Sequence, residues 1–168
     1  MSTRSIIGYV EGDGFVGRYC HWDGYPSWMG SQLWKIIHRD GIKEALLILC
    51  EENYGWSSIH ADKREVIIED GEILDNVRFG YGTAYIDSSE DEWITYAGKN
   101  DEDYWMTEWA YAFSPERDTM SIFYYLGLHG WRLIDVVHLS GDEPEWKQIE
   151  LTAYTTAANL PTLSETQG

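Results

Sequence analysis

The chain has 168 residues and a mass of 19.4 kDa, a size that fits one domain whose core needs no metal or disulfide support. Its 12 Lys and Arg residues against 29 Asp and Glu give a net charge of −17, which repels nucleic-acid phosphates and argues against direct DNA or RNA binding. No apolar run approaches the roughly 20 residues that cross a bilayer, and the first residues lack the apolar segment of a signal peptide, so we expect a cytoplasmic protein outside membranes.

The first predicted element is a β-hairpin with strands at residues 5–10 and 15–22. The connection at 11–14 contains two glycines, which adopt the positive φ angles of a tight turn. Residues of a strand point alternately to its two faces, and in 15–22 neither set is wholly polar. We therefore expect other parts of the chain to cover both faces of this hairpin.

Two helices are predicted after the hairpin. Pro26 suits an early helical position, and the apolar residues that follow it recur at the helical period up to Asp40. A second helix begins at Ile42 and ends near residues 53–55. Because the connection between them is so short, the two helices are expected to be neighbours.

Beyond residue 55 the apolar residues recur with a period of two, which is typical of β-strands. Strands are predicted at residues 64–69, 72–75, 82–87, 92–96, 104–113, 120–125, 131–139 and 146–152. The strand at 104–113 carries its bulky side chains on one face, which we expect to cover the helices or a groove. The predicted fold class is α+β: one domain over 1–156, with a mainly antiparallel sheet and two adjacent helices after the N-terminal hairpin, and a flexible tail at 157–168.

The sequence offers no clear catalytic machinery. Only Cys20 and Cys50 are present, too few for a disulfide framework or a paired-cysteine zinc site, and buried reduced thiols are expected. Cys20 and His21 are adjacent in a strand, so their side chains point to opposite faces and cannot form a thiolate pair. The glycine pattern is not that of a phosphate-binding loop. We therefore predict no catalytic residue, no cofactor and no metal.

The segment YCHWDGYP at residues 19–26 carries a thiol, an imidazole, a carboxylate and three aromatic rings between a strand and a helix. One interpretation is a structural junction in which His21 is satisfied within the sheet and Asp23 bonds backbone amides of the turn. The alternative is a small-molecule-binding or hydrolase site in which these two side chains are the polar groups. Its walls would then be Trp22, Tyr25, Trp28 and Trp109.

The acidic residues are concentrated in the middle of the chain. Residues 1–50 hold five acids and five bases, whereas residues 51–118 hold 18 acids and five bases. The predicted partner-binding residues are Glu69, Asp70, Glu72, Asp87, Glu90, Asp91, Glu92, Asp101, Glu102 and Asp103. We expect them to bind a protein partner with a basic surface, since a field of this sign accelerates such association. Two alternatives remain: acidic loops that only keep an aromatic-rich domain in solution, and an assembly protein with an exposed aromatic patch.

A recognisable pattern in the first part of the chain is made up of Met1–Arg4, Ile6–Gly8, Asp13-Gly14, the segment 19–26 and Gly30. At these positions the chain resembles a family of small uncharacterised proteins from bacteriophages and bacteria. The resemblance implies a phage or mobile-element setting and hence the host cytoplasm, and it transfers no activity and no catalytic residue. In that setting an acidic partner-binding protein would be a counter-defence inhibitor or a nucleic-acid mimic, and its oligomeric state is left open.

Overall fold

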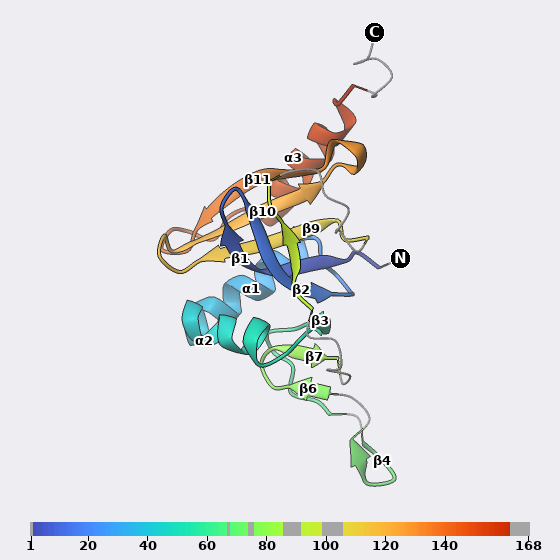
Figure 1. Ribbon diagram of the computed structural model, residues 1–168. Coiled ribbons are helices and arrows are strands. Elements are labelled where there is room, and N and C mark those ends of the chain that lie inside the picture. The colour runs from blue at the N-terminus through green and yellow to red at the C-terminus, as the bar shows by residue number, and fades with distance from the viewer. Residues whose placement is uncertain (1, 67, 74–75, 86–91, 99–105, 162–168) are drawn as a thin grey trace.

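The computed structural model describes residues 2–66, 68–73, 76–85, 92–98 and 106–161. These residues form a single α+β domain in which helices cover one face of a mostly antiparallel nine-stranded sheet (Figure 1). The predicted fold class is therefore confirmed, including the N-terminal β-hairpin and the helices that follow it.

Eight strands of the main sheet follow one another in a continuous order. The ninth, β8 (Ile94–Tyr96), is not part of this order and pairs with β2. In spatial order the eight are β11 (Trp131–His138), β10 (Thr119–Tyr125), β9 (Trp109–Ser114), β1 (Ser5–Glu11), β2 (Gly14–Cys20), β3 (Trp56–Ile59), β7 (Gly82–Ala84) and β6 (Asn76–Arg78). The pairs β1–β9 and β2–β3 are parallel. Strands β4 (Ile68–Glu69) and β5 (Glu72–Ile73) form a separate two-stranded sheet.

In the first third of the chain, the helices lie close to the positions predicted from the sequence. Helix α1 (Pro26–Asp40) is followed by α2 (Ile42–Leu46), which continues as the π-helical turn η1 (Leu47–Glu51). A short 3₁₀ helix, η2 (Gly127–His129), precedes β11, and α3 (Trp146–Ala158) is the last element of the described chain. No helix within the described residues is both long enough and apolar enough to span a membrane.

The main core lies between the helices and one face of the sheet. Helix α1 buries Leu33 and Ile36 there, and strand β9 buries Trp109 and Tyr111 in the same cluster. The bulky face of this strand thus covers the helices, as predicted. Complete burial of each large apolar side chain contributes about 2 kcal/mol.

The opposite face of the sheet is curled around a second apolar cluster. The Trp131 ring of β11 lies 5.0 Å from the Phe15 ring of β2, and the Tyr96 hydroxyl of β8 donates to the Trp131 carbonyl at 3.5 Å. Strands β8 and β11 are the two ends of the path β8–β2–β1–β9–β10–β11, so these contacts require the sheet to curl back on itself. Both faces of the N-terminal hairpin are therefore covered, as predicted.

Small residues on the inner face of this curl let its strands approach closely. Gly8 of β1 lies opposite Gly17 of β2, and Ala110 and Ala112 of β9 lie in the same cluster face. A Cβ at Gly8 would overlap the backbone of the neighbouring strand. Larger side chains here would force the strands apart and open the curl.

The predicted strand at residues 146–152 is wrong, because this segment belongs to helix α3. Its buried residues Trp146, Ile149 and Ala153 recur at the spacing of one helix face. The Trp146 ring packs on α1 at Gly30, where a Cβ would overlap the ring. The helical spacing was therefore present in the sequence and outweighs the β-branched residues of this segment.

Smaller differences concern strand boundaries. The strand predicted at 104–113 begins at Trp109 in the structure, and the short strands β3 and β6 were not predicted. Helix α3 extends through Ala158, into the region predicted as a tail. Of the rest of that predicted tail, residues 159–161 are described and residues 162–168 lie outside the described residues, so the flexibility of 162–168 stays a prediction.

Candidate functional site

Residues 19–26 leave strand β2 and enter helix α1 through a closely bonded passage, which we call the octet corner. The Tyr19 hydroxyl and His21 Nδ1 lie 2.8 Å apart and share a hydrogen bond. The His21 backbone amide donates to the Trp56 carbonyl of β3 at 3.0 Å. The His21 Nδ1 atom and backbone N–H thus both have hydrogen-bond partners within the fold, and the ring lies on the same face of the chain as Tyr19.

Asp23 forms the turn of the octet corner. Its φ of 55° is left-handed, a conformation that Asp tolerates better than most residues. Its exposed carboxylate accepts a long hydrogen bond of 3.4 Å from the Tyr25 hydroxyl. From the core side, the Tyr111 hydroxyl donates to the Gly24 carbonyl at 2.6 Å, so the turn is tied to strand β9.

The six side chains predicted to form a ligand pocket are only partly brought together. His21 and Trp22 touch edge to face, with ring centroids 4.6 Å apart, and Trp22 is 45% exposed. Trp28 instead donates through Nε1 to the Ile59 carbonyl at 3.0 Å. Trp109 is completely buried. Within the described residues no group of three His, Cys, Asp or Glu side chains is placed to hold a metal ion.

A buried carboxylate from the end of the chain supports the octet corner, and the sequence did not point to it. Glu150 of α3 is 2% exposed, and its Oε1 accepts the backbone N–H of Ser27 at 2.6 Å. That N–H is one of the groups at the start of α1 that no helical carbonyl can satisfy. Lys147 lies 3.2 Å from the other carboxylate oxygen. Negative charge at a helix N-terminus is stabilising, so Glu150 fixes where α1 begins.

The two cysteines are free and buried, as expected. Burial raises the pKa of the Cys20 thiol to about 12, and it raises the pKa of Cys50 as well. A thiol must lose its proton to act as a nucleophile or a metal ligand. Both side chains therefore act as core residues at neutral pH.

The β4–β5 hairpin, residues 68–73, carries three of the predicted partner-binding acids and is called the acidic hairpin below. Figure 1 shows it projecting beyond β6 and β7, away from the main sheet. Asp70 and Gly71 both have positive φ angles, 54° and 80°, the combination of a type I′ turn. Glu69 and Glu72, on either side of this turn, are directly opposite each other in the hairpin.

This pairing costs local stability, because like charges directly opposite each other destabilise a sheet. The side chains of Glu69, Asp70 and Glu72 are all exposed, and no ion pair within the described residues neutralises them. Ile68 at the base of the hairpin is 64% exposed. The acidic hairpin thus presents its carboxylates and the Ile68 side chain to solvent, an arrangement that its own stability does not explain.

The remaining predicted partner-binding acids are mostly not placed by the structure. Glu92 is exposed just before strand β8. Asp87, Glu90, Asp91, Asp101, Glu102 and Asp103 lie outside the described residues.

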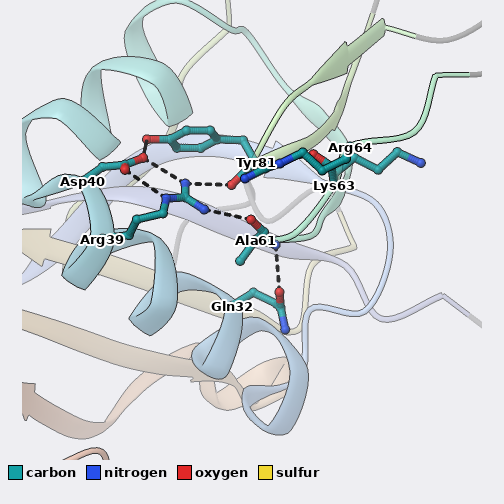
Figure 2. A network of polar contacts seen from close by, with 8 residues as sticks. Gln32, Arg39, Asp40, Ala61, Lys63, Arg64 and Tyr81 are labelled. Atoms are coloured by element: carbon teal, nitrogen blue, oxygen red, sulfur yellow. Dashed lines mark hydrogen bonds and ion pairs between the residues drawn. The ribbon is translucent and has the colours of Figure 1, made fainter.

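Arg39 at the end of α1 holds the segment from which the acidic hairpin emerges (Figure 2). Its Nη1 donates to the Ala61 carbonyl at 2.8 Å and its Nη2 to the Gly80 carbonyl at 2.9 Å. These two carbonyls lie on either side of the excursion that contains β4, β5 and β6. One guanidinium therefore joins both ends of the excursion to helix α1, and we call this arrangement the Arg39 clamp.

Neighbouring side chains orient the clamp. Asp40 accepts two hydrogen bonds from the Arg39 guanidinium, at 2.9 and 2.8 Å, and a third from the Tyr81 hydroxyl. The Gln32 Oε1 atom accepts a hydrogen bond from the Ala61 backbone N–H at 2.8 Å. The hydrogen bonds from Arg39, together with that from Tyr81, lower the pKa of Asp40 to about 2. Burial and the bond to Asp40 raise the pKa of Tyr81, so the network keeps one charge state from mildly acidic to mildly basic pH.

No protein-family model, no curated protein and no solved structure matches this chain in the three comparisons. The resemblance of the N-terminal segment to phage and bacterial proteins therefore remains a prediction.

Proposed function

We propose that this protein acts by binding a protein partner that has a basic surface, with the acidic hairpin as its contact site. The observation that carries the proposal is the projecting turn in which Glu69 and Glu72 face each other unneutralised beside Asp70. A basic partner would remove the repulsion between these carboxylates. Binding would thus recover stability that the isolated chain lacks.

The Arg39 clamp supports this proposal because it joins both ends of the excursion that carries the acidic hairpin to helix α1. A loop anchored at both ends loses less conformational freedom when its tip binds, which improves affinity. In the phage or mobile-element setting implied by the resemblance, the partner would be a host protein whose basic surface binds nucleic acid. The activity would then be counter-defence inhibition or nucleic-acid mimicry.

The test is capture of partners from host lysate with the intact protein, at low salt and at about 1 M salt, where surface electrostatics are screened. We expect a retained protein at low salt that is released at high salt. The triple substitution Glu69→Gln, Asp70→Asn and Glu72→Gln should abolish retention, and Asn keeps the left-handed turn position accessible.

The matched control removes the same charge elsewhere. Glu116→Gln, Asp142→Asn and Glu145→Gln also neutralise three exposed carboxylates and should leave retention intact. Retention that survives the hairpin substitutions, or that is equal at both salt concentrations, would contradict the proposal. Equal loss in both triple variants would show that only net charge matters.

A further inference from the structure

A second surface, far from the acidic hairpin in the fold (Figure 1), is hollowed into an open cavity. It is a cavity of about 360 Å³ at one end of the curled sheet, where the β1–β2 turn, the β9–β10 turn and the end of β11 meet. This volume lies in the range of ligand pockets, which often occupy the mouths of curled or closed sheets. None of the residues of the octet corner lines it, because that corner lies at the other end of β2.

The floor of the cavity continues the second apolar cluster. At the filled end of the curl, Trp131 and Phe123 are buried, at 7% and 5% exposure. Toward the cavity, Leu133 and Val136 of β11 follow on the same strand and are 48% and 38% exposed. The inner face of the curl is therefore filled with aromatic rings at one end and leaves apolar side chains open at the other.

The rim of the cavity carries charges of both signs. Arg117 comes from the β9–β10 turn and Asp13 from the β1–β2 turn, and both side chains are exposed. The polar residues Ser114, Thr119, Ser121 and His138 line the same space. Asp13 would repel a ligand that carries only a negative charge, and Arg117 would repel a ligand that carries only a positive charge. A ligand with both charges complements both side chains.

We propose that this cavity binds a small zwitterion with an apolar side chain, the chemistry of a free apolar amino acid. Its carboxylate pairs with Arg117, since guanidinium and carboxylate form strong charge-assisted hydrogen bonds. Its ammonium group pairs with Asp13. Its side chain lies on Leu133 and Val136. This site is independent of the acidic hairpin and of the proposed partner.

The test uses three probes that share one apolar body: phenylalanine, 3-phenylpropionate, which lacks the ammonium group, and 2-phenylethylamine, which lacks the carboxylate. Amide chemical shifts of the intact, isotope-labelled protein are followed during titration. We expect phenylalanine to cause saturable shifts at Gly12, Gly14, Ser121 and Val136, and to bind at least about tenfold more tightly than either fragment.

Substitutions at the rim provide the matched controls. Arg117→Gln and Asp13→Asn should each weaken phenylalanine binding about tenfold or more. Arg132→Gln removes the same charge from an exposed position on β11 that does not line the cavity, and it should leave binding unchanged. The proposal is overturned if no probe shifts these amides, if a fragment binds as tightly as phenylalanine, or if Arg117→Gln and Arg132→Gln have equal effects.

Discussion

At the octet corner, the Asp23 carboxylate is exposed, but several other polar groups have hydrogen-bond partners within the fold. The His21 ring bonds to the Tyr19 hydroxyl, the Gly24 carbonyl accepts the Tyr111 hydroxyl, and Glu150 accepts a backbone amide at the start of α1. In the acidic hairpin, Glu69 and the other carboxylates instead face solvent, and two of them oppose each other across a two-stranded sheet.

This difference separates a structural role from a functional one. Polar groups that satisfy one another inside the fold are explained by folding, because leaving any of them unpaired would cost free energy. Charges that repel one another at an exposed tip are not explained in that way. The segment with the most varied chemistry in the sequence thus has the bonding of a junction, while the simpler acidic hairpin is the stronger candidate for an interaction site.

The largest loss of stability is expected when the buried Glu150 carboxylate, which supports the octet corner, is removed. Glu150→Ala leaves the Ser27 amide at the start of α1 without its acceptor, and we expect a loss of about 3 kcal/mol in the free energy of unfolding. Glu150→Gln retains an acceptor oxygen and should lose about 1 kcal/mol. Urea denaturation followed by tryptophan fluorescence measures both. A loss below about 0.5 kcal/mol in the Ala variant would show that the corner does not depend on this bond.

The second effect concerns the anchor of the acidic hairpin. Arg39→Met keeps the apolar part of the side chain and removes the hydrogen bonds to Ala61 and Gly80, so the free energy of unfolding should fall by about 2 kcal/mol. Hydrogen exchange should accelerate at the Gly80 amide, which bonds to the Lys63 carbonyl at the base of the excursion. The octet corner should keep its protection. Uniform acceleration in both regions would contradict a local clamp.

The third effect is a dependence on pH at the same anchor. The pKa of Asp40 is lowered from 3.8 to about 2 in the folded protein. A carboxyl group with a lowered folded pKa stabilises the fold above its unfolded pKa, and this contribution is lost as the pH falls through the folded pKa. Between about pH 4 and pH 2 the Asp40 contribution, on the order of 1 kcal/mol after allowance for solvent screening, should disappear. Asp40→Asn should lack this component when unfolding is measured across that range.

The smallest effect tests the turn of the octet corner. Asp23 has a left-handed φ, which glycine adopts without strain and alanine does not. Asp23→Ala should therefore cost about 1 kcal/mol of stability, whereas Asp23→Gly should be close to neutral. Neither variant should alter partner capture. If Asp23→Gly keeps full stability but abolishes capture, the corner is a functional site and the comparison with the acidic hairpin fails.

Local patterns explain what could be predicted from the sequence. The glycines at 11–14, the helical spacing after Pro26 and the Asp70-Gly71 pair are short-range signals, and each element they predicted is present. The helix at 146–158 was missed although its spacing of Trp146, Ile149 and Ala153 was also local. In this segment the helical period of the buried residues decides the structure, and the β-branched residue types do not.

Long-range pairing explains what could not be predicted. Arg39 bonds to carbonyls 22 and 41 residues further along the chain, and Glu150 meets the Ser27 amide across 123 residues. A single sequence carries no signal for such contacts, because any exposed Arg or Glu has the same local pattern. The curl of the sheet is equally non-local, since it brings together β8 and β11, the two ends of the path β8–β2–β1–β9–β10–β11.

The central claim is that the acidic hairpin contacts the partner, and zero-length carbodiimide cross-linking tests it most directly, because it joins carboxylates to lysine amines in contact. Trypsin cuts after Arg64 and Arg78, so one peptide, residues 65–78, contains Glu69, Asp70 and Glu72. The octet corner lies in a different peptide, 19–35. We predict that lysine-containing peptides of the captured partner are joined to 65–78. Cross-links found on 19–35 and absent from 65–78 would contradict the account.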